Sequence, residues 1–387
     1  MGLADFVDRT VTHVRNTPVD AAELPPGGVQ GSLFSGAAGV AFFLLEMGRL
    51  RADPSLLPVA RRWWALANAW AARATPDDWY GLPDGFLAGE AGVAHVDALL
   101  SAAEGDARRV LAAVERVDHV TARGATGAQF RPGELVGGMA GVACLTRDLA
   151  ARLHAPSGSI ATSTLLARVE ARAVASLETD TTPAAEAQTL GMAHGVAGEL
   201  WVLLRAHGAG GVDMRRRLAE LAALRRHDDE GLVHWARTPD EIDQVCAWCA
   251  GLAGQSVLWT DVARRSGNDD DASLARSIAT SLAALPERTP GICCGLAGQA
   301  LAFQRFADLT GDARFTRIAY DRLARAAAIV DTHRDLRLGL WQGALGVALV
   351  AEQRLRGIAR FPLLEPPAPD EAIGSRGRAS RRRAASA

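Results

Sequence analysis

The sequence predicts an all-α protein in which seven helix-pair repeats close into a ring, an α/α toroid. Three observations support this fold class. A motif with two glycines recurs seven times along the 387 residues, helical patterns alternate with its copies, and the first and last copies are as apolar as the others. Internal repeats of this length indicate one supersecondary unit that is stacked or closed on itself.

The repeated motif is Gly-x-x-Gly followed by an apolar stretch, and it returns every 44–57 residues. Glycine at such a turn allows unusual backbone angles and a close approach of other segments. A helix that starts there also directs its N-terminus into the space in front of the turn. The copies lie at residues 36–39, 89–92, 138–141, 195–198, 251–254, 295–298 and 343–346.

The stretch after each glycine pair is expected to be a helix. Apolar residues fall at positions i, i+3, i+4 and i+7 in Ala- and Leu-rich segments such as VAFFLLEMGRL and VAHVDALLSAA. Second helical patterns lie between the copies, for example LPVARRWWALANAWAARA and FTRIAYDRLARAAAIV, and convincing strand alternation is lacking. Each repeat is therefore predicted to be a helix pair, with the glycines where the chain turns into the second helix.

The ends of the repeat array favour a closed ring over an open solenoid. A solenoid needs polar capping repeats, whereas the terminal copies here, FSGAAGV and WQGALGV, are apolar. We therefore expect inner helices surrounded by outer helices, with all seven turns at one end of the central cavity. This arrangement is a single domain over residues 1–365. The Ala-, Arg- and Ser-rich remainder, residues 366–387, is expected to be a disordered tail.

Composition excludes several function classes. A net charge of −2 offers no electrostatic attraction to nucleic acid or to a membrane surface. Every basic residue is arginine, so a Schiff-base lysine and a P-loop lysine are both excluded. No signal peptide is visible, and no apolar run reaches the roughly 20 residues that span a bilayer. Five cysteines without an export signal indicate thiols or metal ligands in the cytoplasm.

Four potential metal ligands lie at the turns of three different repeats: His194, Cys249, Cys293 and Cys294. A toroid brings these turns together at one rim. Three thiolates and one exchangeable position form a tetrahedral zinc site of the open, catalytic kind. The sequence thus predicts one zinc ion per chain, held by Cys249, Cys293 and Cys294.

The other cysteines leave an alternative open. Cys246 precedes Cys249 in CAWC, so a closed, structural site made of residues 246, 249, 293 and 294 competes with the open one. Cys144 lies within the helix after its turn, where core packing is the expected role. His95 follows its glycine pair by three residues and is expected to be structural.

The signature turns of the lanthionine synthetase C-like family resemble three turns of this sequence, AWCAGLAG, GICCGLAG and GMAHGVAG. The resemblance extends from about residue 31 to about residue 362. It implies a zinc-dependent cyclase that adds peptide cysteine thiols to dehydroalanine or dehydrobutyrine, which forms thioether rings. Cys249 and Cys293 match two family ligands. Cys294 stands where histidine is usual, as in the three-cysteine members of the family.

The resemblance also implies catalytic roles. His194 matches the histidine of the family's His-Gly turn and is the candidate for acid–base work. Glu134 stands where relatives have an aspartate, so it could orient His194 or move a proton; a solvated carboxylate is the alternative. Ala250 and Val245 replace a tyrosine and an arginine found in relatives, which leaves no residue assigned to stabilise the enolate.

The expected partners follow from the same resemblance. The substrate is a dehydrated precursor peptide, prepared by separate dehydratase, kinase or lyase proteins; neither nucleic acid nor a membrane span is expected. Two other functions stay open. One is addition of a small thiol such as glutathione to dehydrated residues, and the other is a non-catalytic toroid that binds peptide around a structural zinc.

Overall fold

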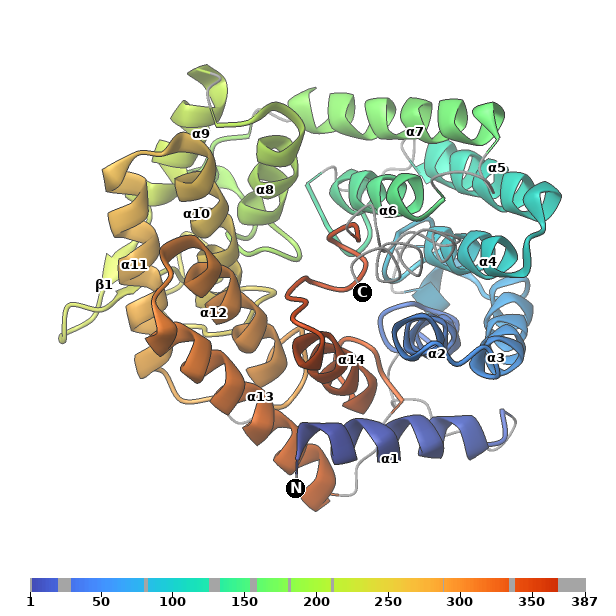
Figure 1. Ribbon diagram of the computed structural model, residues 1–387. Coiled ribbons are helices and arrows are strands. Elements are labelled where there is room, and N and C mark those ends of the chain that lie inside the picture. The colour runs from blue at the N-terminus through green and yellow to red at the C-terminus, as the bar shows by residue number, and fades with distance from the viewer. Residues whose placement is uncertain are drawn as a thin grey trace, which may run out of the picture.

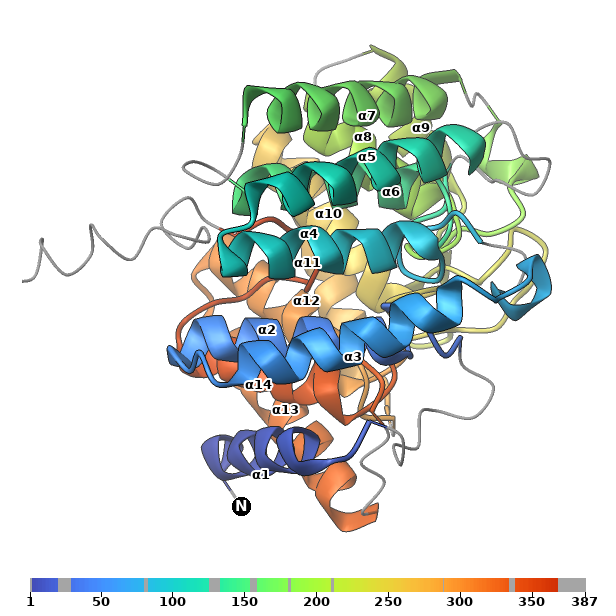
Figure 2. The ribbon, with the colours of Figure 1, turned by 90° about the vertical axis from the view of Figure 1, so that its right-hand side faces the viewer.

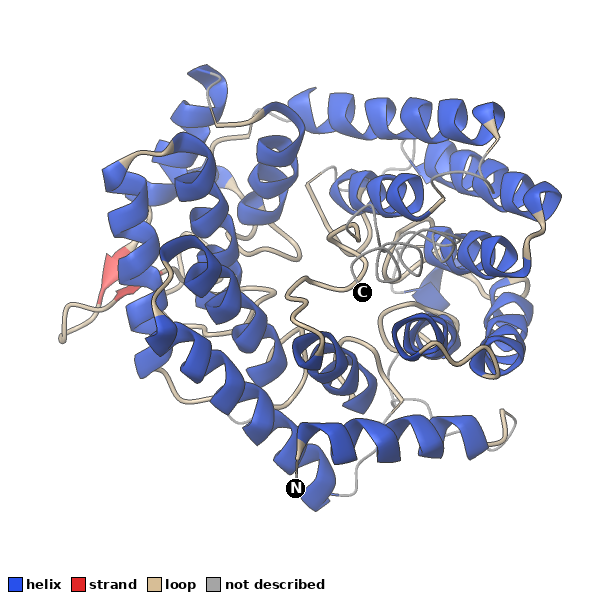
Figure 3. Ribbon diagram, in the orientation of Figure 1, coloured by secondary structure: helices blue, strands red, loops and turns tan. Residues whose placement is uncertain are grey.

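The computed structural model is almost entirely helical, with one pair of very short strands (Figure 3). It describes residues 2–19, 29–79, 83–124, 133–153, 159–179, 182–209, 212–287, 289–333 and 338–367. The described residues form fourteen α-helices, arranged as two concentric rings around a central axis (Figure 1). The predicted α/α toroid is confirmed.

The inner ring consists of the seven helices that follow the glycine motifs. Each packs against the next, and the last packs against the first. The inner helices are α2 (Ala37–Arg51), α4 (Glu90–Glu104), α6 (Met139–Arg152), α8 (Val196–His207), α10 (Leu252–Ser266), α12 (Leu296–Thr310) and α14 (Ala344–Leu355).

The outer ring consists of the other helix of each pair. Helix α1 completes this ring, because Arg9 pairs with Asp331 of α13 at 2.6 Å and Arg15 donates to Ser55 beside α3 at 3.0 Å. The outer helices are α1 (Leu3–Asn16), α3 (Leu56–Ala71), α5 (Ala107–Gly124), α7 (Ile160–Thr179), α9 (Val212–Ala223), α11 (Asp269–Ala284) and α13 (Ala313–His333). Seen from the side, helices such as α3, α4, α5 and α7 lie roughly parallel to one another and run from one end of the ring toward the other (Figure 2).

Burial follows the apolar pattern of each helix type. Helix α2 buries 12 of its 15 residues, because it is covered by neighbours on nearly every side. Helix α3 buries 6 of its 16, and these recur at helical spacing along one face. An all-round apolar helix belongs inside and an amphipathic one at the surface. The sequence of each helix therefore decides the ring to which it belongs.

The glycine motif is explained by the way each inner helix starts. The first glycine is the residue before the helix, and the second is at its third position. At the second glycine of all seven motifs, a Cβ atom would come within 3.0 Å of the carbonyl oxygen six residues earlier. The chain folds back against its own helix start at that point, so only glycine fits there.

Backbone hydrogen bonds join the seven turns into a closed ring. The amide of Phe34 in the first turn donates to Leu87 in the second at 2.9 Å, and the amide of Trp341 in the last turn donates back to Phe34 at 3.0 Å. The intervening bonds run from Leu87 to Val136, Leu135 to Ala193, Ala193 to Cys249, Cys249 to Cys293 and Cys293 to Trp341. The turns thus share one rim, as predicted.

Three smaller elements complete the described chain. Two 3-10 helices, Pro76–Trp79 and Ala184–Glu186, precede the turns of α4 and α8. The strands β1 (Arg226–His227) and β2 (Val233–His234) form an antiparallel pair that helical patterning does not predict. Its paired residues lie between α9 and the cysteine-bearing turn of α10.

The C-terminal segment after α14 turns into the centre of the ring, where it is drawn in red in Figure 1. Phe361 is 1% exposed and stacks on Trp248, with ring centroids 5.7 Å apart. Glu365 forms a buried ion pair with Arg305 of α12. This segment therefore fills part of the space that the inner helices enclose.

Two sequence expectations are only partly covered by the described residues. From residue 368 on, the predicted tail lies outside them, so the division into a domain at 1–365 and a tail stays a prediction. Within the described ranges, no helix combines the length and the apolar character needed to cross a membrane.

Candidate metal centre

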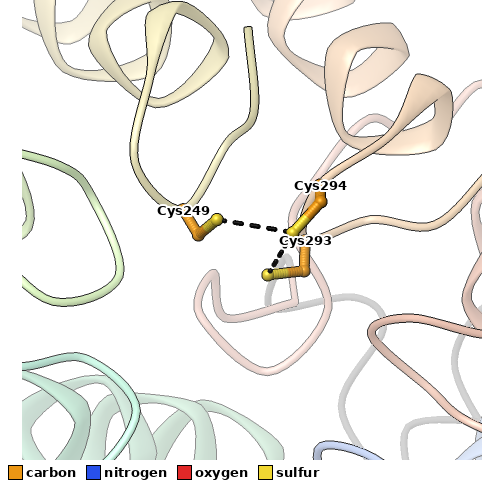
Figure 4. A group of neighbouring side chains, drawn as sticks. All are labelled: Cys249, Cys293 and Cys294. Atoms are coloured by element: carbon orange, nitrogen blue, oxygen red, sulfur yellow. Dashed lines mark hydrogen bonds between the residues drawn. The ribbon is translucent and has the colours of Figure 1, made fainter. Parts of the chain in front are cut away.

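Three cysteines from two neighbouring turns meet at the rim (Figure 4). Cys294 Sγ lies 3.5 Å from Cys249 Sγ and 3.4 Å from Cys293 Sγ, and the three sulfur atoms all lie within 4.8 Å of one another. Cys249 and Cys293 occupy the same motif position, two residues before the first glycine. The backbone bond from the Cys249 amide to the Cys293 carbonyl, 3.2 Å long, holds these positions side by side.

The three thiols share protons because they cannot all ionise next to one another without a cation. Hydrogen bonding from Cys249 and Cys293 lowers the pKa of Cys294. Hydrogen bonding to its neighbours raises the pKa of Cys293 well above its ordinary value, with burial adding to the rise. One thiolate and two thiols is therefore the arrangement expected of the metal-free cluster.

The donor set fits a zinc ion. Zinc favours thiolate ligands in tetrahedral geometry, and its positive charge would allow all three sulfur atoms to ionise. Cys293 is buried and 5% exposed, whereas Cys249 is half-buried and Cys294 is exposed. The cluster therefore has a buried side and an open side, and the open side can admit a fourth ligand.

Cys246 lies outside this cluster. Its Sγ donates to Glu287 Oε2 at 3.0 Å, and within the described residues only Cys249, Cys293 and Cys294 form a group with metal-binding spacing in this region. The closed four-cysteine arrangement is therefore not the one found. Burial and the neighbouring Glu287 carboxylate raise the pKa of Cys246 to about 12.

His194 and Glu134 form a pair on the two turns that precede the cysteines. His194 Nδ1 contacts Glu134 Oε1 directly. The histidine side chain is 46% exposed at the rim, whereas the carboxylate is only 7% exposed. His194 is not part of the cysteine cluster. The structure thus brings the five predicted site residues to four consecutive turns, the third to the sixth. They form two groups there, the His194–Glu134 pair and the three cysteines.

The family model described as "Lanthionine synthetase C-like protein" matches residues 28–362. The chain belongs to this family. Among solved structures, nisin cyclase is similar to it at 15% sequence identity, with 95% of this chain and 97% of that chain covered and a TM-score of 0.68. At this identity the likeness shows the shared fold. No curated protein matches the sequence.

The His194–Glu134 contact of this lanthionine synthetase C-like protein follows a register that the other turns repeat. In each case, one turn contributes the residue four positions before the first glycine of its motif. The following turn contributes the residue directly before the first glycine of its own motif, and these two residues face each other. A Cβ on Gly85 would lie 2.6 Å from Gly137 Cα, and one on Gly191 would lie 2.6 Å from Ala250 Cα. Glu134 replaces this glycine in the third turn and therefore reaches the fourth.

Two threonines hold the exposed site residues and were not found by sequence reasoning. Thr189 Oγ1 lies 2.5 Å from the His194 carbonyl oxygen, and Thr289 Oγ1 lies 2.7 Å from the Cys294 carbonyl oxygen. Both stand six residues before the first glycine of their turn. A comparison of the TLGMAHG and TPGICCG segments could have identified them, since the threonine is shared.

Arg237 is a second residue that the motifs do not indicate. Together with His194, its positive charge contributes to the lowered pKa of Cys294, after the larger effect of the neighbouring thiols. The Arg237 carbonyl accepts a hydrogen bond from the Leu190 amide at 2.8 Å, which ties its loop to the fourth turn. No repeat position corresponds to it, so only the folded chain places it near the cysteines.

The remaining candidates lie in the core. His95 is fully buried, and its Nε2 is 3.1 Å from Asp148 Oδ2 within a cluster of buried charges. Cys144 is 2% exposed, and burial raises the pKa of its thiol to about 12. These surroundings agree with the structural roles expected of both residues.

Proposed function

We propose that this protein is a zinc-dependent lanthipeptide cyclase. It would add the cysteine thiols of a dehydrated peptide to dehydroalanine or dehydrobutyrine residues of the same peptide and so form lanthionine and methyllanthionine rings. The observation that carries the proposal is the presence, on one rim, of a three-cysteine cluster beside an exposed histidine with a buried carboxylate partner. Membership of the lanthionine synthetase C-like family and the likeness to a protein named nisin cyclase support it.

The residues that would hold zinc are Cys249, Cys293 and Cys294. Zinc bound there would supply a thiolate near neutral pH, because coordination lowers the pKa of a substrate thiol. The chain's own contribution is the exposed side of the cluster, where Cys294 lies at the surface. A peptide thiol would approach from that side.

His194 would move the proton in this reaction. Because Nδ1 faces the Glu134 carboxylate, we assign the ring proton to Nδ1, which leaves Nε2 as the base. As sulfur bonds to Cβ, the electron pair of the double bond moves onto the adjacent carbonyl and forms an enolate. His194 takes the thiol proton and returns it to Cα. One S–H bond and the π bond of the C=C are consumed, and one C–S and one C–H bond form.

The proposal is tested by incubating the protein with a dehydrated peptide and then alkylating the free thiols. Ring closure leaves the peptide mass unchanged and removes alkylatable thiols. We expect Cys249→Ala to lose both zinc and ring formation, and Cys246→Ala, the matched control three residues away, to retain both. A zinc-loaded wild-type protein that leaves every thiol alkylatable would overturn the proposal and favour a peptide-binding toroid.

The same experiment separates ring closure from addition of an external thiol. With glutathione present, intermolecular addition would raise the peptide mass by that of one glutathione per dehydrated residue. We propose that the peptide's own cysteines are used, that separate proteins dehydrate the peptide, and that the reaction takes place in the cytoplasm. A peptide that gains mass while it retains its free cysteines would contradict this assignment.

A further inference from the structure

The position just before the first glycine of each motif places its side chain at the rim. In the fourth and sixth turns this position holds His194 and Cys294, and both are exposed. In the seventh turn it holds Gln342, which is exposed as well. The other four turns have small residues there: Ser35, Ala88, Gly137 and Ala250. Gln342 is thus the one further large polar side chain at this repeat position.

The backbone of Gln342 is held against the double-cysteine turn. The carbonyl of the preceding residue, Trp341, accepts hydrogen bonds from the amides of Ile292 and Cys293, both at 2.9 Å. A Cβ on Gly291 would lie 3.0 Å from Gln342 Cα. Trp341 itself is fully buried and packs on Trp248, with ring centroids 4.9 Å apart. Gln342 therefore stands on a rigid support next to the cysteines.

The side chain of Gln342 has no carboxylate partner on the preceding turn, whereas His194 has Glu134 there. The residue on the preceding turn that faces Gln342 is Gly291, which has no side chain. Among the residues that the structure describes, the Gln342 amide makes no hydrogen bond. An exposed amide donor is therefore available at the rim, on the turn that follows the cysteines, while His194 lies on the turn that precedes them.

We infer that the Gln342 side-chain amide donates a hydrogen bond to the carbonyl oxygen of the dehydrated residue under attack, and is a further catalytic residue. This inference rests on the proposed function. When sulfur bonds to Cβ, the double-bond electron pair moves onto that oxygen, and a positioned N–H group stabilises the negative charge as it develops. His194 then returns the thiol proton to Cα from the other side of the cysteines.

Such a donor would fill a role that the residues at the two positions suggested by the family resemblance cannot. Ala250 and Val245, at the positions suggested by the family resemblance, carry no hydrogen-bond donor in their side chains. Gln342 provides two N–H groups and no charge, so it would interact weakly with the neutral substrate and more strongly with the enolate. The effect of its removal should therefore be on the chemical step.

The test compares Gln342→Ala, Gln342→Glu and the control Gln304→Ala, whose amide donates to Asp308 on α12. We expect Gln342→Ala to lower kcat about 10²-fold, the lower end of the range for loss of one such donor. Gln342→Glu keeps the size but opposes the enolate charge, so its loss should be larger. Zinc content and unfolding temperature should stay unchanged, and Gln304→Ala should cyclise at the wild-type rate.

The outcomes are distinguishable. A wild-type protein that cyclises together with a Gln342→Ala variant of equal kcat overturns the role of Gln342 and leaves the proposed function in place. An increase in KM alone assigns Gln342 to peptide binding and overturns the enolate role. Loss of zinc in Gln342→Ala makes its role structural. A zinc-loaded wild type without cyclase activity overturns both proposals.

Discussion

At the scale of single residues, the proposed proton transfer depends on His194, which contacts Glu134. His194 lies outside the cysteine cluster, so His194→Ala should retain zinc and the fold. We expect ring formation to fall by about 10²–10⁴-fold, the usual effect of removing a general acid–base group. Thiol alkylation over time measures the rate, and metal analysis measures the zinc.

The alternatives for His194 give different results in the same two measurements. A variant that cyclises at the wild-type rate would transfer the proton role to Glu134 or to water. A variant that loses its zinc would show that the ligand set includes the histidine. Glu134→Gln serves as the companion variant, because it keeps the contact with His194 and removes the charge.

At the scale of elements, buried ion pairs hold the inner helices together. Glu46 of α2 pairs with Arg152 of α6 at 2.6 Å, and both side chains are 2% exposed. Burial alone would raise the pKa of Glu46, but the guanidinium groups of Arg152, Arg49 and Arg360 outweigh it and lower the pKa from 4.5 to about 2. The ionised carboxylate is therefore strongly favoured in the folded protein.

This pairing predicts a pH dependence of stability. Because the folded-state pKa lies below the unfolded one, Glu46 contributes stability above about pH 4.5, and the contribution is lost as pH falls toward 2. At 1.36 kcal/mol per pKa unit the contribution is on the order of 3 kcal/mol. Measured with denaturant at pH 7, the free energy of unfolding of Glu46→Gln should lie well below that of wild type. In acid, the difference between the two free energies should shrink by this amount.

A matched control is available on α4. Glu104 pairs with Arg61 near the surface and is 33% exposed, so Glu104→Gln should change the free energy of unfolding by less than about 1 kcal/mol. If wild type and Glu46→Gln differed in free energy of unfolding by the same amount at pH 7 and at pH 3, the stability of the buried ion pairs would not depend on the charge of Glu46.

At the scale of the whole molecule, the C-terminal segment links the ring interior to the rim. Phe361 stacks on Trp248, the residue before Cys249, and Glu365 pairs with Arg305, which also binds Asp261 at 2.6 Å. Through these contacts the last described residues touch the turn that carries Cys249 and helix α12, which follows the double-cysteine turn. The segment therefore belongs to the architecture of the candidate metal centre.

Truncation tests this assignment. A chain that ends after Pro367 should keep its zinc, its unfolding temperature and its cyclase rate. A chain that ends after Leu355 should be strongly destabilised and lose zinc, since it exposes Trp248 and leaves Arg305 without its second carboxylate. Phe361→Ala should cost about 3–5 kcal/mol, as large-to-small core changes do. Equal thermal stability of the two truncated chains would contradict a structural role for residues 356–367.

Much of the fold and part of the site could be predicted from particular residues. The second glycine of each motif is required by a contact within its own turn, so all seven copies show the same signal. Cys249 and Cys293 share a motif position on neighbouring turns, which is enough to predict that their sulfur atoms meet. Thr189 and Thr289 were predictable by the same alignment of turns. Signals of this kind are local and repeated.

The sequence by itself determined the ring of seven helix pairs, the side of it that holds the turns, and the cysteine cluster, because each depends on local spacing repeated along the chain. Only the tertiary structure decided which side chains meet across segments that do not correspond in the repeats. The ion pair between Glu365 and Arg305 and the electrostatic effect of Arg237 on Cys294 both involve segments with no common pattern. They depend on the rotation between successive repeats and on the path of the chain through the ring, and spacing along the sequence records neither.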